Sequence, residues 1–238
     1  NEELESARQA VRDLYQAGVD AIIVQDMAYL QMNECNMTIH ASTQANNFTK
    51  EKVKWFENAG IERVVLAREL SIEDIKEIHS YCPNVELEFF IHGALCCSVS
   101  GRCYLSHYQT GRSANRGECC QSCRSSYDLL NENGEVLMKD AYLLSTKDFN
   151  ASSKLEDLIL SGVVSFKIEG RLKDINYVRN VTAYYSELMN DFCKRNPQYK
   201  RSSYGKVDLN FSPDVEKSFN RGFTIFNLEG KSEKTGNM

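Results

Sequence analysis

The chain has 238 residues, of which 42% are hydrophobic and 26% are charged, and its formal net charge is −5. This composition is typical of a soluble globular protein, and the sequence holds no apolar run of the length that a transmembrane helix needs. The acidic balance argues against a basic surface that binds nucleic acid over its whole extent, although it leaves room for a local anion site.

An amphipathic helix is predicted at the start of the chain. Residues 1–15 carry Leu4, Ala7, Val11 and Leu14 at helical spacing among charged side chains, a pattern unlike that of a secretory signal peptide. Without an export signal, we expect a cytoplasmic protein with no membrane partner, whose cysteines serve metal or redox chemistry and not disulfides.

Short runs rich in β-branched residues then alternate with amphipathic stretches. One predicted helix spans residues 50–58, and another spans residues 71–81, begun by Ser71 with Asp74 three positions later. The predicted strands are residues 21–25, 38–42, 63–67, 85–91 and 163–168. Alternation with such short connections predicts parallel strands, and therefore an α/β protein, most simply a TIM-barrel-like (β/α) fold or part of one.

Polar residues follow the end of each predicted strand. They are Gln25 and Asp26, Thr43 and Gln44, Arg68 and Glu69, His92, and Glu169 and Arg171. A single residue of this kind often only caps the next helix. In a β/α barrel, however, the active site lies at the carboxyl ends of the strands, so their shared position predicts an active site there.

The loop after the fourth predicted strand is rich in cysteine. Residues 92–124 hold six of the nine cysteines of the chain. Four of their thiols meet around one metal ion or cluster if the loop folds back on itself: Cys96, Cys103, Cys119 and Cys123. Their neighbours Cys97 and Cys120 are possible substitutes.

The same loop is basic. It contains Arg102, Arg112, Arg116 and Arg124 but a single acid, Glu118, which gives it a formal charge of +3 and leaves −8 for the rest of the chain. These arginines have two possible roles: they balance the negative charge of thiolates, or they bind a carboxylate or phosphate through their planar donors.

Charged residues alternate at the end of the strand at residues 163–168. Lys167, Glu169 and Arg171 project to one side, so we expect Glu169 to orient a cation while Lys167 or Arg171 meets an anionic substrate. A self-satisfied ion pair is the alternative. Glu88 lies within an apolar strand, where a buried carboxylate needs a cation or a raised pKa. His40 is expected to be a core histidine.

Beyond the cysteine loop, residues 127–138 predict a β-hairpin with its turn at residues 131–134, which we expect to cover one side of the loop. Helices are predicted at residues 152–161 and 176–193, the second ended by Asn196-Pro197. The expected organisation is a partial barrel over residues 1–195, with a cysteine-rich insertion at 92–140, and a polar and aromatic extension over residues 196–238.

Several motifs together resemble a known family. They are HASTQAN (His40 to Asn46), RVVLARELS (Arg63 to Ser71), the pattern from Glu88 to Ser106, TGRSANRGEC (Thr110 to Cys119), SFKIEGRLK (Ser165 to Lys173) and FNRGFT (Phe219 to Thr224). At this spacing the chain is similar, over nearly its whole length, to peptidase family U32, the collagenase-like proteases. It differs in its two Cys-Cys doublets and in starting after the first barrel strands, so it is expected to be part of a longer protein and inactive alone.

The resemblance implies a function other than proteolysis. Some members of the family hydroxylate RNA bases, notably the wobble uridine of tRNA, with prephenate as a small carboxylate co-substrate and a [4Fe-4S] cluster on cysteines of this motif. It implies that Cys96, Cys103, Cys119 and Cys123 hold such a cluster, with zinc as the alternative. Arg102, Arg112, Arg116 and Arg124 are then the cofactor-binding candidates, and Glu88, His92, Lys167, Glu169 and Arg171 the catalytic candidates.

Two other functions remain open from the sequence. One is a collagenase-like protease acting on peptide or collagen, in which Cys96 is a nucleophile four residues after His92. The sequence contains no HExxH or GxSxG motif that would support other protease chemistries. The other is a binding module without catalysis, in which a metal only stabilises the loop.

Overall fold

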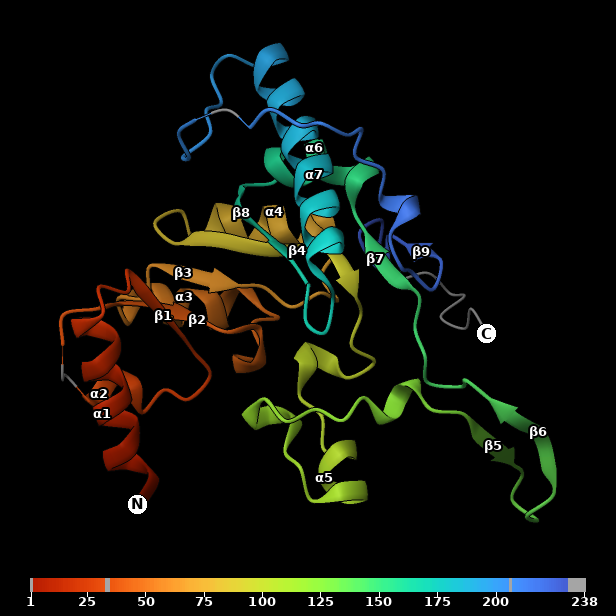
Figure 1. Ribbon diagram of the computed structural model, residues 1–238. Helices are drawn as coiled ribbons and strands as arrows, with labels where there is room; N and C mark the ends of the chain where they lie inside the picture. The colour runs from red at the N-terminus through yellow and green to blue at the C-terminus, as the bar shows by residue number, and fades with distance from the viewer. Residues whose placement is uncertain (1, 33–34, 206, 231–238) are drawn as a thin grey trace.

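The computed structural model describes residues 2–32, 35–205 and 207–230, and its centre is a mixed β-sheet flanked by helices (Figure 1). Strands that follow one another along the chain run parallel in this sheet, in the order β1-β2-β3-β4-β8. They are β1 (Ala21–Val24), β2 (Thr38–Ala41), β3 (Arg63–Val65), β4 (Glu86–Ala94) and β8 (Val163–Ile168). The predicted α/β class and all five predicted strands are therefore confirmed.

The long strand β4 organises the sheet. Its first residues pair with β3, and its length pairs with β8 from Leu87 to His92. Its end pairs in antiparallel fashion with β7 (Asp148–Asn150), and β7 in turn pairs with β9 (Phe223–Thr224). The segment beyond residue 195 thus contributes a strand to the same sheet. These last two strands were not predicted, because runs of two or three residues carry no periodicity.

A closed barrel is not confirmed. Among the described residues, β1 pairs with β2 alone and β8 pairs with β4 alone, so the parallel strands form an open sheet. The architecture that the structure supports is a mixed α/β fold with a parallel sheet and helices.

The helices begin where the sequence places side-chain caps. Ser71 and Asp74 form the predicted capping box, and Thr49 and Asp174 each accept a hydrogen bond from a backbone N–H of the helix that follows. The helices are α1 (Glu2–Gln16), α2 (Tyr29–Met32), α3 (Lys50–Asn58), α4 (Ile72–Tyr81), α5 (Leu105–Thr110), α6 (Leu155–Leu160) and α7 (Ile175–Arg195). Within the described part of the chain, none is both long and apolar enough to cross a membrane.

The core lies between the sheet and the helices that cover one of its faces. Phe56 of α3 and Ile75 of α4 are fully buried there, with Phe89 of β4. Phe89 meets Phe149 of β7 edge to face, with ring centroids 6.3 Å apart. This apolar packing fixes the position of β4, whose end leads into the cysteine-rich loop.

The predicted hairpin forms but does not cover the loop as expected. Strands β5 (Tyr127–Leu130) and β6 (Val136–Ala141) pair with each other and extend away from the rest of the molecule (Figure 1). Side chains on β6 such as Leu137 are exposed. The hairpin contacts the loop at its base, where the Tyr127 hydroxyl donates to the Ser122 carbonyl at 2.7 Å.

Candidate active site

A cavity of about 340 Å³ lies at the carboxyl ends of the parallel strands. Its wall includes Thr43 and Gln44 after β2, Arg68 after β3, and Glu169 and Arg171 after β8. The cysteine-rich loop, which leaves the end of β4, supplies the opposite wall. The structure thus confirms the prediction that strand ends and the loop share one face.

Five thiols line this cavity. They belong to Cys96, Cys97, Cys103, Cys119 and Cys123. All nine cysteines of the chain are free, as expected for a protein that does not use disulfides. The loop therefore folds back as the metal-site hypothesis requires, and the four proposed ligand thiols face one space.

Three of the proposed ligand thiols already accept a hydrogen bond from the backbone. In each case the donor is the N–H two residues further along the chain, at 3.4 Å from the sulfur: Ser98 to Cys96, Leu105 to Cys103, and Gln121 to Cys119. Hydrogen bonds to sulfur stabilise thiolates and tune the potential of iron–sulfur clusters. The local backbone is thus arranged to receive negative charge on these sulfurs.

Polar contacts hold the two halves of the loop together. Asn115 accepts a hydrogen bond from the Cys103 N–H at 3.1 Å, and the buried Ser106 hydroxyl accepts one from the Cys120 N–H at 3.2 Å. The loop is also fixed to the sheet, because Gln44 donates to the Gly101 carbonyl and Glu69 accepts from the Ser100 N–H. These contacts position the thiols without the help of a metal.

The extra cysteine of each doublet differs from its neighbour. Cys120 lies outside the cavity lining, and its sulfur is 3.0 Å from the Ser122 hydroxyl. Hydrogen bonds from Ser106 and Ser122 lower the pKa of Cys120 to about 7. Cys97 instead lines the cavity and shares a hydrogen bond with Cys123, which lowers the pKa of Cys97 to about 6. Cys97 is therefore the nearest substitute for Cys123, whereas Cys120 is not placed to be a ligand.

The donor set fits a thiolate-bound group. Four sulfurs around one cavity match the ligands of a [4Fe-4S] cluster and also those of a zinc ion. Within residues 2–32, 35–205 and 207–230, no three His, Cys, Asp or Glu side chains come close enough together to hold a single metal ion. The thiols accordingly face a shared space and do not form a compact site for one ion.

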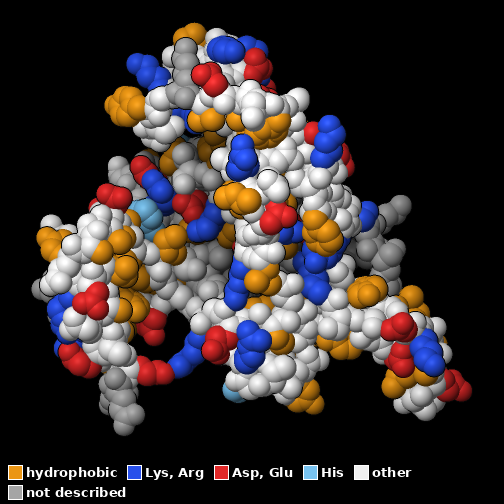
Figure 2. Space-filling view, in the orientation of Figure 1, with side chains coloured by type: hydrophobic (Ala, Val, Ile, Leu, Met, Phe, Trp, Pro, Cys, Tyr) orange, Lys and Arg blue, Asp and Glu red, His pale blue; other side chains and the backbone are white. Residues whose placement is uncertain are grey.

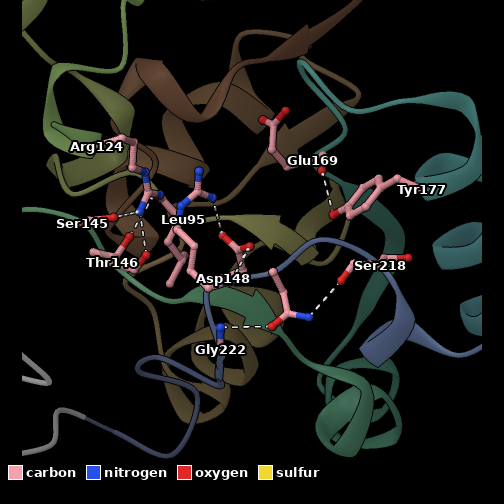
Figure 3. A network of polar contacts seen from close by, with 11 residues as sticks. Leu95, Arg124, Ser145, Thr146, Asp148, Glu169, Tyr177, Ser218 and Gly222 are labelled. Atoms are coloured by element: carbon pink, nitrogen blue, oxygen red, sulfur yellow. Dashed lines mark hydrogen bonds and ion pairs between the residues drawn. The ribbon is translucent and has the colours of Figure 1, made fainter. Parts of the chain in front are cut away.

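The four predicted loop arginines do not act together. Arg124 lines the cavity, but its guanidinium donates to the carbonyls of Leu95 and Thr146, both at 2.6 Å, and to the Ser145 hydroxyl (Figure 3). It fixes the loop to the segment before β7. The other three arginines lie outside the lining of the cavity: Arg102, Arg112 and Arg116.

The side chains of these three arginines lie on the surface or contact another helix. Arg102 and Arg112 are exposed. Arg116 forms a bidentate ion pair with Glu3 of α1, at 2.6 and 3.0 Å. The prediction that all four contact a cofactor is thus wrong for these three, because the path of the loop directs their side chains outward.

Arg68 lines the cavity, and the sequence placed it among the polar strand-end residues without naming it as a catalytic or cofactor-binding candidate. Its guanidinium stacks over the Phe90 ring, 3.7 Å from the centroid. Burial lowers the pKa of Arg68, and the nearby Cys96, Glu169 and Glu69 partly oppose this effect. Among the described residues, it has no carboxylate within ion-pair distance. Arg68 is the first polar residue after β3, so its position at the carboxyl end of a strand is the sequence signal that marks it as a site candidate.

The buried Glu88 forms an ion pair with Lys167, which is half-buried and lines the cavity. Glu88 is 7% exposed, and its carboxylate lies 3.0 Å from the Lys167 ammonium, 2.7 Å from the Ser165 hydroxyl and 3.6 Å from Arg63. Burial alone would raise the pKa of Glu88, but these partners together lower it. Glu88, and not Glu169, therefore orients Lys167.

Glu169 and Arg171 line the cavity as predicted. The Glu169 carboxylate accepts the backbone N–H of Arg171 at 2.8 Å, and the Arg171 side chain donates to the Gly117 carbonyl. Gly93 makes this arrangement possible. It has φ of +105°, and a Cβ there would lie 2.4 Å from the Glu169 carbonyl oxygen.

His92 does not reach the cavity. It is 2% exposed and packs among Tyr177, Tyr185 and Phe223, with its Nδ1 atom 3.3 Å from the Tyr185 hydroxyl. Burial lowers the pKa of His92 to about 4, so the ring is neutral. The structure thus separates His92 from Cys96 and places it in an aromatic core, which corrects its assignment as a catalytic residue.

Comparisons with known proteins agree on one family. Peptidase family U32 matches residues 1–238. The chain is 45% identical to a 23S rRNA 5-hydroxycytidine C2501 synthase of Escherichia coli, over 99% of this chain and 36% of that protein. It is 37% identical to tRNA hydroxylation protein P1 of Bacillus subtilis, over 81% of this chain and 48% of that protein.

A protein named for proteolysis is similar as well. The chain is 33% identical to a collagenase of Porphyromonas gingivalis, over 94% of this chain and 55% of that protein. The chain therefore spans between about a third and about half of the length of these relatives.

Proposed function

The chain belongs to peptidase family U32, and from this membership and the geometry of the cavity we propose that it takes part in the hydroxylation of a pyrimidine base in RNA. The observation that carries the proposal is the cavity at the strand ends, where thiols that accept backbone hydrogen bonds face Arg68, Lys167 and Arg171. The identity with relatives named for rRNA and tRNA hydroxylation supports the same conclusion. Action on RNA agrees with the expected cytoplasmic location.

We propose that Cys96, Cys103, Cys119 and Cys123 hold a [4Fe-4S] cluster. When bound, such a cluster supplies electron transfer at a potential that is set by nearby charge and by hydrogen bonds to sulfur. The backbone donors to three of these thiols, and the cations across the cavity, would offset the negative charge of four thiolates.

The cations of the cavity also suit a small carboxylate co-substrate such as prephenate. Lys167 is paired with Glu88, and Arg124 donates to backbone carbonyls, so both are occupied. Arg68 keeps its donors free of any carboxylate in the described part of the chain, and its planar guanidinium can bind a carboxylate through two hydrogen bonds. We assign the binding of the carboxylate to Arg68.

The parallel order of β1, β2, β3, β4 and β8 supports a further proposal on the fold. In it, the open sheet is part of a β/α barrel, with the cavity at the catalytic face of that barrel.

Metal analysis tests the proposed function directly. After anaerobic purification, we expect iron and inorganic sulfide with the visible absorption of an iron–sulfur cluster. The Cys103→Ala variant should lose the iron, whereas the matched Cys120→Ala variant should keep it, because Cys120 lies outside the cavity. A colourless protein with one zinc ion would contradict the cluster.

The activity is tested in cells, which supply the oxidant that the gain of an oxygen atom requires: RNA from cells that lack the protein, and from the same cells given back the longer protein of which this chain is expected to be part, is digested to nucleosides and analysed by mass spectrometry. We expect pyrimidine nucleosides that have gained one oxygen atom, and Arg68→Met should abolish the gain while keeping the iron content. Both cytidine and uridine are scored, since the relatives modify different RNAs. The proposal would be contradicted if the longer protein held iron and still restored no modified nucleoside.

Proteolysis is the second candidate, favoured by the similarity to a collagenase. A thiol protease needs a base beside its nucleophile, but no histidine of the described residues lines the cavity. Gelatin cleavage by metal-free protein, lost in Cys96→Ala, would support this candidate over RNA hydroxylation.

A further inference from the structure

A second and larger hollow, of about 780 Å³, adjoins the thiol cavity. It lies between the first turns of α7 with the loop before them and the C-terminal segment at residues 210–221; we refer to it as the α7 groove. Ala94, Gln121 and Arg171 line both hollows. A polymer lying in the α7 groove therefore passes directly into the candidate active site.

The lining of the α7 groove is strongly basic. It contains five cations and one acid, Asp174, for a formal charge of +4 in a protein whose net charge is −5. Asp174 is occupied as the N-cap of α7, where it accepts the Tyr177 N–H at 2.8 Å. Figure 2 shows Lys and Arg side chains gathered beside the lower part of α7. The cations are Arg171, Lys173, Arg179, Lys217 and Arg221.

Several of these cations lack an ionic partner. In the described part of the chain, Arg171, Lys173 and Arg179 have no carboxylate within ion-pair distance. Lys217 pairs with Asp214 at 3.5 Å on the exposed surface, where such a pair contributes little. Arg221 is held by Asp148 at 3.3 Å. Most of the positive charge is thus available to an external anion.

Aromatic rings lie beside the cations. Lys173 is 4.3 Å from the centroid of Phe219 and 4.8 Å from that of Tyr177, and Arg179 is 5.8 Å from that of Phe211. Phe219 is 63% exposed, which is unusual for a phenylalanine in a folded protein. Of these rings Phe219 is the exposed one, and an exposed ring next to cations is the pattern by which proteins bind single-stranded nucleic acid: a base stacks on the ring and phosphates contact the cations.

The C-terminal wall of the groove is held in place by partly buried polar contacts. Asn180 of α7 donates to the Asp214 carbonyl at 2.6 Å and to the Ser218 hydroxyl at 2.7 Å, and it accepts the Asp214 N–H at 2.9 Å. Asp148 of β7, which is 2% exposed and is labelled in Figure 3, accepts hydrogen bonds from the Arg221 side chain and backbone. The groove is therefore preformed and does not have to order on binding.

We propose that the α7 groove binds a single-stranded segment of RNA and leads it to the thiol cavity. The inference rests on the proposed function, since it names the surface that would engage the RNA substrate. An acidic peptide would use the cations but not the exposed ring of Phe219, so this ring favours RNA. The phosphates contact Arg171, Arg179 and Lys217, and a base stacks on Phe219.

Binding of a fluorescently labelled oligoribonucleotide of roughly ten nucleotides tests the inference, measured by anisotropy over a range of salt concentrations. The double variant Arg179→Ala/Lys217→Ala should bind at least about tenfold more weakly at low salt. It should also reduce the slope of log affinity against log salt by about 1.4, since each phosphate contact on a single strand contributes about 0.7. Phe219→Leu should weaken binding about tenfold and leave this slope unchanged.

The control removes the same charge elsewhere. Lys76 of α4 and Lys194 of α7 are exposed and lie outside the groove, so Lys76→Ala/Lys194→Ala should bind like the unmodified protein. Equal affinities for the two double variants would overturn the inference, as would equal competition by polyglutamate and by unlabelled RNA. If RNA binding depends on the groove residues but the nucleosides stay unmodified, the proposed hydroxylation alone is refuted. If the RNA is hydroxylated but its binding does not depend on the groove residues, the groove inference alone is refuted.

Discussion

Replacement of His92 by glutamine should remove a pH dependence from the stability of the protein. His92 is 2% exposed, and burial lowers the pKa of its ring from 6.5 to about 4, with Asp148 opposing this effect and Lys173 adding to it. In the unfolded chain the ring returns to its ordinary pKa, so below pH 6.5 the unfolded state binds the proton more readily. The stability that His92 provides is therefore complete above pH 6.5 and is lost as the pH falls to about 4.

The size of this effect follows from the two pKa values. Each pKa unit is worth about 1.4 kcal/mol, so a pKa lowered from 6.5 to about 4 corresponds to about 3 kcal/mol in all. About 2 kcal/mol of this is lost between pH 7.5 and pH 5, because the folded ring stays neutral over that interval. The glutamine variant loses the contact with Tyr185 at every pH, but it does not titrate.

Urea denaturation of the reduced, metal-free protein at pH 7.5 and pH 5 measures the difference. Between these values the unmodified protein should lose about 2 kcal/mol more unfolding free energy than His92→Gln does. His107→Gln, which replaces an exposed histidine of the cysteine-rich loop, should behave like the unmodified protein. Parallel pH profiles for the unmodified protein and His92→Gln would refute the reasoning. An activity lost without any change in stability would restore His92 as a catalytic candidate.

Two further predictions concern the residues around the cavity. Gly93→Ala should destabilise the protein by about 2 kcal/mol or more in urea denaturation, because the residue has positive φ and its Cβ would collide with the Glu169 carbonyl. Gly134→Ala, also at positive φ but with open space around its Cβ, should destabilise it by about 1 kcal/mol. Equal losses of stability in the two variants would show that the collision at Gly93 is relieved. In a double-mutant cycle, Glu88→Gln and Lys167→Met should each destabilise the protein and show a coupling energy of about 1 kcal/mol, whereas additive effects would mean that the pair does not orient Lys167.

The cavity shows which parts of a site can be predicted from a sequence. The thiols of Cys96, Cys103 and Cys119, and the charged residues Glu169 and Arg171, line it as expected. They were predictable because the carboxyl ends of parallel strands meet on one side of a sheet, whatever the details of packing. The direction in which a single side chain points is harder to predict from the sequence than the position of its residue at a strand end.

His92 illustrates the limit. It follows Phe90 by two positions on β4, so strict alternation would place both side chains on one face. The register of β4 against β8 shifts between these two residues, and His92 lies instead against the aromatic side chains of α7. Such an irregularity depends on the neighbouring strand and leaves no local trace in the sequence.

The sequence by itself determined the α/β class, the positions of the five parallel strands and of α1, α3, α4, α6 and α7, the capping box of α4, and the family, because these follow from short-range periodicity and from motifs contiguous in the chain. The tertiary structure alone decided that the Arg68 guanidinium stacks over Phe90, that Arg116 forms an ion pair with Glu3 away from the thiol cavity, and that residues 171–180 and 210–221 enclose a basic groove. These outcomes depend on contacts between segments far apart in the sequence, where packing and charge compensation decide which way each side chain turns.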